Sequence, residues 1–297
     1  TEGVLHIKPL SSNVGTGTLA DINTALPLTK GQTNIPALAA YAGKSLNFSS
    51  SDMYLARQGS TTSYRYELTF VVLNALGDIE PPLPFDIPST VTFSTFNTEI
   101  LADKVNVSGI GVFPNSGTGD RERIVNCSRS NTDIEMEIRN LTAFPILQLF
   151  ASQNCVNNNY INSNAVGAKV ESTNYAYNLI GANHSLINCH ESDCRRGFDC
   201  QYTTNVRIKG GSYPDNATGP IVNIRSDAPE FTGLVNIKGN RIIFDLVSYT
   251  GSEVFTLYDQ SFLNTAYDGT VDLKMPKKVS FSDNHIHVTG TGHTAIL

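Results

Sequence analysis

The sequence repeats one short pattern three times between Gly167 and Arg225: GAKVE at residues 167–171, GFDCQ at 197–201 and GPIVNIR at 219–225. Each copy places a glycine one or two residues before a segment in which apolar and polar residues alternate. Alternation with period two is typical of a β-strand with one buried face. Because each strand is short and half-buried, it is stable only if the next copy stacks on it. The pattern therefore predicts a solenoid whose turns carry loops of unequal length.

A second set of copies lies out of phase with the first and contains a bend. VNNNYI at 156–161, IKGGSY at 208–213, IKGNRI at 237–242 and FSDNHI at 281–286 each run from an apolar residue, through Asn, Gly or Asp, to a large apolar residue. Asn and Gly tolerate the left-handed conformation that turns a strand sharply, and stacked asparagines can hydrogen-bond to one another. Two strands separated by such a bend, repeated along the chain, predict a coil of parallel β-strands.

The Gly-led strands and the asparagine bends resemble the right-handed parallel β-helices of pectate-lyase-like proteins. The Asn-rich, loop-interrupted version looks most like phage tailspikes. This resemblance covers roughly residues 100–297 and implies an all-β fold, a right-handed parallel β-helix (solenoid) at residues 96–297. It also implies a homotrimer in the virion tail, folded in the host cytoplasm, that contacts other virion tail proteins and recognises, with or without cleaving, a host cell-surface polysaccharide.

Residues 1–95 lack the repeat and are expected to form a small β-rich cap or assembly domain, because the first edge of a solenoid needs a cover. Strands are expected at 4–7 and 66–73, and a short helix at 37–42. The run PPLPFDIP at 81–88 predicts a hinge or domain boundary.

The coil itself is expected to begin with the strand at 91–93. At the other end, GHTAIL at 292–297 starts a turn and stops within it, which predicts a coil truncated at that end.

Composition excludes several classes of function. The net charge of −6 disfavours nucleic acid as a partner, and the absence of an 18-residue apolar run argues against membrane insertion. The five cysteines are expected to be buried thiols that fill space in the core, since no C-x-x-C pair occurs. His285 and His287 share one strand face without an evident third ligand, so neither a metal site nor a cofactor is expected.

Aligning the Gly-led strands places two rows of side chains on the outer face. Neighbouring turns lie about 4.8 Å apart. Glu171 and Asp199 would then be about 5–7 Å apart, within the range in which two carboxylates cleave a glycosidic bond. The alternative is a solvated sheet face balanced by Lys169 and Arg225. The first row reads Gln148, Lys169, Asp199, Asn223 and Thr256, and the second reads Glu171, Gln201, Arg225 and Tyr258.

The densest polar cluster is HESDCRR at 190–196, expected as a loop that overhangs these rows. Its histidine and carboxylates could transfer protons, and its arginines could bind an acidic sugar. The alternative is a turn held by internal ion pairs. The candidate catalytic residues are therefore Glu171, Asp199, Glu191 and Asp193, and the candidate substrate-binding residues are Lys169, His190, Arg195, Arg196, Gln201, Asn223, Arg225 and Tyr258.

Tyrosines on the sheet faces could stack on sugars: Tyr160, Tyr175, Tyr177, Tyr202, Tyr213 and Tyr258, of which Tyr202 and Tyr213 are the most probable core residues. Two other functions remain open from the sequence. One is a non-enzymatic glycan-binding adhesin or structural virion β-helix. The other is a secreted bacterial polysaccharide lyase, for which only Lys169 and Arg225 could serve as the base. A trimer favours the virion protein, and a monomer favours the secreted enzyme.

Overall fold

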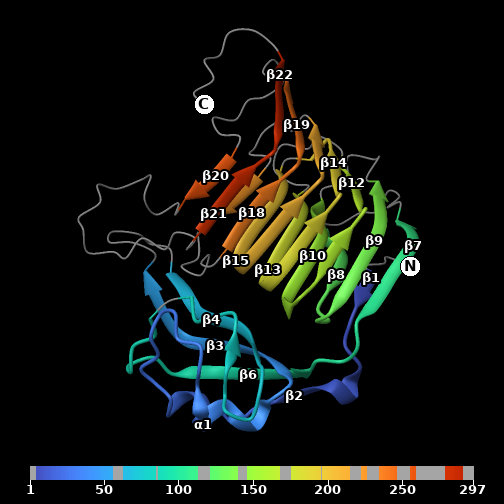
Figure 1. Cartoon of the computed structure of the whole chain (residues 1–297). Coiled ribbons are helices and arrows are strands. Elements are labelled where there is room, and N and C mark those ends of the chain that lie inside the picture. Colours follow the sequence, from blue (N-terminus) through green and yellow to red (C-terminus); the bar gives the residue numbers. More distant parts are fainter. Residues whose placement is uncertain are drawn as a thin grey trace, which may run out of the picture.

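The computed structural model describes residues 5–55, 63–84, 86–112, 121–139, 146–167, 175–194, 196–214, 222–225, 234–245, 255–258 and 278–289. The fold is all-β and consists of a coil of parallel strands beside a smaller antiparallel sheet (Figure 1). This confirms the parallel β-helix with an N-terminal β-rich region. The described residues contain no helix that is long and apolar enough to cross a membrane.

Within the described residues, the coil is one sheet of 17 strands that winds from turn to turn, and its pairings there are parallel. Its strands form three faces. Within each face, a strand pairs with the strands of the neighbouring turns. The first face stacks β1 (Leu5–Ile7), β8 (Arg121–Cys127), β10 (Ile146–Val156), β13 (Tyr175–Ile187), β15 (Arg196–Lys209), β17 (Val222–Arg225) and β20 (Phe255–Tyr258).

The second face continues from the long strands of the first. It stacks β7 (Val105–Val112), β9 (Thr132–Arg139), β11 (Asn159–Ile161), the ends of β13 and β15, β18 (Leu234–Lys238) and β21 (Lys278–Ser282). The third face stacks the end of β9, β12 (Asn164–Val166), β14 (His190–Ser192), β16 (Ser212–Pro214), β19 (Arg241–Asp245) and β22 (His285–Thr289).

The bends between faces are made by residues in the left-handed conformation, as the second sequence pattern predicts. The bend between the first and second faces uses Asn131, Asn157, Asn183 and Asn205, with φ between 52° and 60°. The bend between the second and third faces uses Asn162, Asn188, Gly210, Gly239 and Asp283, also at positive φ. Side-chain amides link successive turns: Asn157 Nδ2 donates to Asn131 Oδ1 over 3.0 Å, and Asn188 Nδ2 to Asn162 Oδ1 over 2.8 Å.

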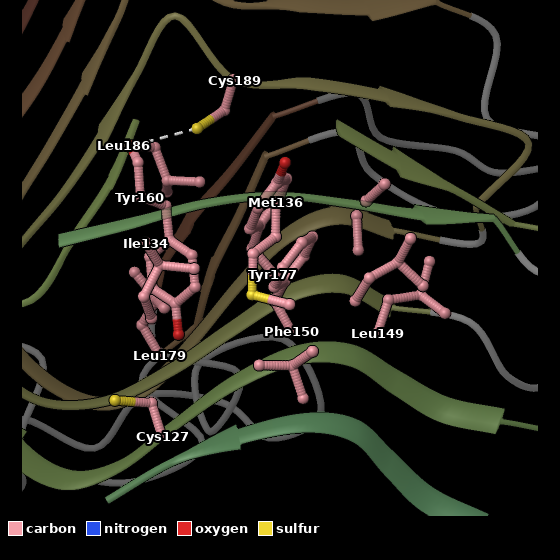
Figure 2. Packing of buried hydrophobic residues seen from close by; sticks show 14 of the residues in the cluster. Cys127, Ile134, Met136, Leu149, Phe150, Tyr160, Tyr177, Leu179, Leu186 and Cys189 are labelled. Atoms are coloured by element: carbon pink, nitrogen blue, oxygen red, sulfur yellow. Dashed lines mark hydrogen bonds between the residues drawn. The ribbon is translucent and has the colours of Figure 1, made fainter. Parts of the chain in front are cut away.

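The interior of the coil is filled by apolar side chains, among them three aromatic rings that contact one another (Figure 2). Phe150 and Tyr177 are parallel at 5.1 Å between ring centroids, and Tyr160 meets both edge-on. The Tyr160 hydroxyl bonds to Ser152 Oγ at 2.9 Å, so its burial leaves no polar atom unpaired. Tyr160 and Tyr177 are fully buried, and the expectation that they could stack on sugars is therefore wrong.

The alternating segment Thr132–Arg139 points its apolar residues inward and Glu135 and Glu137 outward, as its sequence indicates. Among the described cysteines, Cys127, Cys155, Cys189 and Cys194 are buried thiols, which confirms the expectation for these four.

The smaller sheet is antiparallel, in the order β2 (Val14–Thr16), β6 (Phe93–Ile100), β3 (Lys44–Leu55), β4 (Ser63–Val72) and β5 (Ile79–Glu80). Its core centres on Phe48, whose ring contacts those of Phe70, Phe93 and Phe96. Three short helices accompany the sheet: η1 (Ser11–Asn13), α1 (Leu19–Asn23) and η2 (Pro36–Tyr41), the last close to the predicted helix.

Three expectations about this N-terminal part are wrong. The strand that starts at Phe93 belongs to β6 in the antiparallel sheet, so the expected boundary at residues 95/96 falls inside a strand. Residues 5–7 form β1, which pairs with β8 in the coil. The proline-rich run is not a hinge, because Leu83 and Ile87 are buried in the domain core and Ile87 pairs with Leu28.

The two parts are joined by a buried polar contact. Glu99, at the end of β6, accepts hydrogen bonds from the backbone N–H of Ser130 at 3.0 Å and from its hydroxyl at 2.6 Å. Arg129 Nη2 donates to the carbonyl of Asp103 over 2.7 Å. Val71 of β4 also packs against Val156 and Ala182 of the coil. The antiparallel domain is thus held against the side of the first turns.

Candidate functional site

The predicted rows on the first face are only partly in register. Asp199 pairs with Asn223, and Asn223 pairs with Thr256, as the alignment of Gly-led strands requires. Arg225 likewise pairs with Tyr258. On the preceding turn, however, the partner of Asp199 is Asn178 of β13. The described neighbours of Asp199 on both sides are therefore amides.

The expectation that Gln148 heads this row is wrong by three residues. Gln148 pairs with Arg123 and Tyr175, whereas Ala151 is the residue in line with Asn178. The side chain of Gln148 is buried and accepts a 3.0 Å hydrogen bond from Arg123 Nε. The described strand of the next turn is β13, in which Asn178, and not Lys169, is the partner of Asp199. Lys169, Glu171 and Arg195 lie outside the described residues.

The cluster at 190–196 is not an overhanging loop, because His190–Ser192 form strand β14 and Arg196 begins β15. Glu191 points inward and is only 1% exposed, so the expectation that it could act on a substrate is wrong. Burial raises the pKa of the neighbouring Cys194 thiol, and the Glu191 and Asp193 carboxylates raise this pKa further. Asp193 is half-buried and makes the bend after β14, with φ of 56°.

His190 is the member of this cluster that contributes to an outer face. Its ring is half-buried, and its Nδ1 lies 2.8 Å from the hydroxyl of Ser212 on the next turn. The strand register continues this line, which we call the third-face column. It reads Glu137, Asn164, His190, Ser212, Arg241 and His285, in order from the first turns of the coil.

Two further columns run along the outside of the second face. The first reads Asp133, Asn159, Ser185, Arg207, Asn236 and Ser280. The second reads Ile161, Ile187, Lys209, Lys238 and Ser282. In each column, one residue per turn is presented at the strand spacing of about 4.8 Å.

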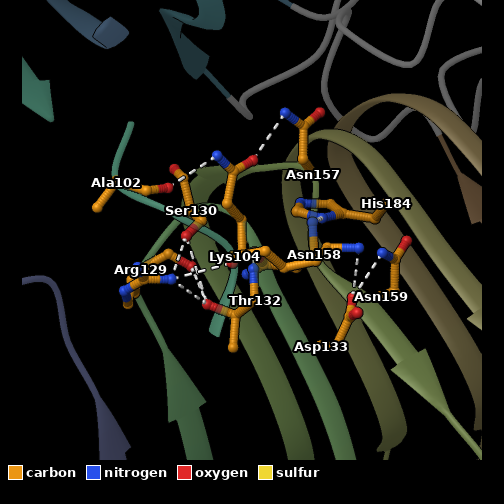
Figure 3. Close-up of polar contacts among 11 residues, drawn as sticks. Ala102, Lys104, Arg129, Ser130, Thr132, Asp133, Asn157, Asn158, Asn159 and His184 are labelled. Carbon is orange, nitrogen blue, oxygen red and sulfur yellow. Dashed lines mark hydrogen bonds and ion pairs between the residues drawn. The ribbon is translucent and has the colours of Figure 1, made fainter. Parts of the chain in front are cut away.

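Charge changes sign along these columns. In the first turns of the coil, Asp133 forms an ion pair with Lys104 at 2.9 Å and accepts a 2.7 Å hydrogen bond from Asn159 (Figure 3). Glu135 and Glu137 lie on the same strand as Asp133. Farther along, the second face carries three exposed cations, Arg207, Lys209 and Lys238. We call these three residues the basic strip.

The basic strip was missed by the sequence alignment of Gly-led strands, although a signal was present. Lys209 and Lys238 stand at the same position in two copies of the bend pattern, IKGG and IKGN. The structure shows that they are direct partners on adjacent turns. Aligning the bends rather than the glycines would have placed them in one column.

Among the described residues, no three histidine, cysteine, aspartate or glutamate side chains gather to hold a metal ion. His285 lies on an exposed strand end.

A cleft of about 550 Å³ separates the antiparallel sheet from the coil and is lined by residues such as Thr16, Asn97 and Asn154. Its carboxylate, Glu99, already accepts hydrogen bonds from Ser130. We therefore assign this carboxylate to the contact between the two parts of the chain.

No known family model matches the chain, and no curated protein sequence is similar to it. The solved structures with a similar fold include two phage tailspikes. The Pseudomonas phage phi297 tailspike gp61 matches with a TM-score of 0.45 and 12% sequence identity, over 93% of this chain and 57% of the tailspike. The tailspike protein gp49 from Pseudomonas phage LKA1 matches with a TM-score of 0.39 and 13% identity, over 83% of this chain and 46% of its own. The chain thus spans about half the length of these two proteins.

Proposed function

We propose that this chain is part of a phage tailspike, in which the outer faces of the parallel β-helix bind a host cell-surface polysaccharide. The observation that carries the proposal is the set of outward columns on the second and third faces. Two of the three columns repeat a polar or charged residue once per turn along the coil, and the third does so from Lys209 onward. A polymer that lies along the axis can contact several turns at once, so that weak single contacts add up.

The chemistry of the columns suits a sugar polymer. Asn164, His190 and Ser212 present amide, imidazole and hydroxyl groups, which can donate to and accept from sugar hydroxyls. These residues sit on strands that pair on both sides, so their positions are fixed before a ligand arrives. Preorganised groups lose little conformational entropy on binding.

Binding without cleavage is favoured over catalysis by the surroundings of Asp199. An acid and nucleophile pair needs a second carboxylate within several ångströms, and the described partners of Asp199 are Asn178 and Asn223. Cleavage by Glu171 and Asp199 is tested directly. Asp199→Asn and Glu171→Gln should leave binding intact, and they should lower turnover by at least about 10²-fold if these residues are catalytic.

Adsorption of the labelled protein to bacterial cells tests the proposal. Adsorption should be abolished when cell-surface sugars are oxidised with periodate, should survive treatment of the cells with protease, and should be inhibited by extracted surface polysaccharide. Sensitivity to protease but not to periodate would show a protein receptor and refute the proposal. Light scattering tests the assembly: the tailspike proposal requires three copies of the 32.2 kDa chain, and a monomer would favour a secreted enzyme.

A further inference from the structure

We propose that the polysaccharide is anionic and that its acidic groups bind the basic strip formed by Arg207, Lys209 and Lys238. This inference rests on the proposed function and names the substrate class of the same outer surface. The three residues are exposed on the second face. Arg207 and Lys209 are two residues apart on β15, so both point outward, and Lys238 is the partner of Lys209 on the next turn.

Among the described residues, little of the charge of the basic strip is neutralised. Within the described part of the chain, one ion pair involves the strip, between Lys238 Nζ and Asp283 Oδ2 at 3.2 Å. Both side chains are more than half exposed, and such a surface pair contributes little free energy. Three cations on two adjacent turns therefore repel one another across about 5–7 Å, a cost that a bound polyanion would remove.

The rest of the surface directs a polyanion to this place. The chain carries a net charge of −6, and the second face bears Asp133 and Glu135 in the first turns of the coil. An acidic polymer is repelled there and attracted farther along the coil, where the sign reverses. On the third face, the column changes in the same direction, from Glu137 in the first turns to Arg241. The charge gradient therefore favours one end of the surface for binding.

An acidic glycan fits this strip better than a nucleic acid does. Ser282, the partner of Lys238, and Asn188, whose backbone N–H donates to the Lys209 carbonyl, border the basic strip and supply hydrogen-bonding groups for sugar hydroxyls. Three cations are few for a duplex, whose affinity depends on many phosphate contacts, and the negative net charge opposes its approach. Duplex DNA is therefore the comparison polymer in the test.

The test measures binding of immobilised protein to sodium polygalacturonate, which carries a carboxylate on every sugar residue, and to uncharged dextran. We expect polygalacturonate to bind at about 0.01 M salt and to weaken at about 0.15 M, because the screening length falls from about 30 Å to about 8 Å. The double variant Lys209→Gln/Lys238→Gln should bind roughly 10-fold more weakly.

The matched control is Lys8→Gln/Lys30→Gln, which removes two exposed lysines from the N-terminal part of the chain and changes the net charge equally. It should bind like the parent, and circular dichroism should show an unchanged fold in both double variants. Equal losses in the two double variants, equal affinity for dextran, equal affinity for duplex DNA, or no binding to polygalacturonate would each refute the anionic class. Periodate-sensitive adsorption to cells would still support the proposed function in those cases, and its absence would refute that function separately.

Discussion

Replacing Asn158 by alanine should destabilise the coil by about 3 kcal/mol, although the residue lies in a run of three asparagines that look equivalent in sequence. Asn158 is fully buried inside the first bend. Its Oδ1 accepts a 3.1 Å hydrogen bond from the backbone N–H of Thr132, and its Nδ2 donates to the sulfurs of Cys155 at 3.1 Å and Cys127 at 3.3 Å. Figure 3 shows that Asn157, Asn158 and Asn159 point to different partners.

The magnitude follows from what alanine leaves behind. The Thr132 N–H would be buried without an acceptor, which costs about 1–3 kcal/mol. The volume of the lost amide adds about 1 kcal/mol as a small void between the two thiols. At about 2–4 °C per kcal/mol, the midpoint of thermal unfolding should fall by roughly 6–12 °C.

The matched control is Asn159→Ala, which removes a side chain of the same type one residue later. Asn159 is half-buried and donates to the partly exposed Asp133, so its loss should cost about 0.5–1 kcal/mol. Both variants are compared by urea unfolding at pH 7.5, with the slope of the transition checked for two-state behaviour. The reasoning would be refuted if Asn158→Ala were no more destabilising than Asn159→Ala.

Three other perturbations test the interior. Gly181→Ala should prevent cooperative folding, because φ is +133° and a Cβ there would lie 2.0 Å from the Cys155 carbonyl oxygen; a cooperative melt like that of the parent would contradict this. Burial lowers the pKa of His184 to about 4, below the unfolded value of about 6.5, so its contribution to stability is full above pH 6.5 and is lost as the pH falls towards 4. The urea midpoint of the parent should therefore fall more steeply over that range than that of His184→Asn. Burial raises the pKa of Cys189 to about 12, so this thiol should not react with a disulfide reagent at pH 8 until urea unfolds the chain; rapid labelling of the folded protein would disprove its burial.

The coil could be predicted because its two determinants are local. Strand alternation and left-handed asparagine or glycine bends are properties of short segments, and residues such as Asn188 and Gly239 adopt the conformation that their types favour. The stacking order followed from these segments without knowledge of distant contacts.

The candidate site was less predictable because it depends on register between turns. On the preceding turn, the partner of Asp199 is Asn178 rather than Lys169, so the predicted row is interrupted there. The exposure of Glu191 was predicted wrongly from its polarity. A carboxylate in a polar cluster is expected to be exposed, whereas the position of Glu191 on β14 turns its side chain inward. The basic strip becomes evident only when Lys209 and Lys238, which are 29 residues apart in the sequence, are aligned as partners on adjacent turns.

The pairing of β1 with β8 makes the antiparallel domain an insertion within the coil. The chain lays down three residues of the first turn, builds an entire five-stranded domain, and then returns at β7 to continue the same solenoid. A truncated chain that begins at residue 96 would therefore also lack β1, a strand of the coil, and the edge of β8 at Val125 would be uncovered. Excising the domain while keeping Leu5–Ile7, by a short linker to residue 102, would instead preserve that first turn. The antiparallel domain is thus delimited by two positions in the sequence, one after β1 and one before β7, rather than by a single boundary.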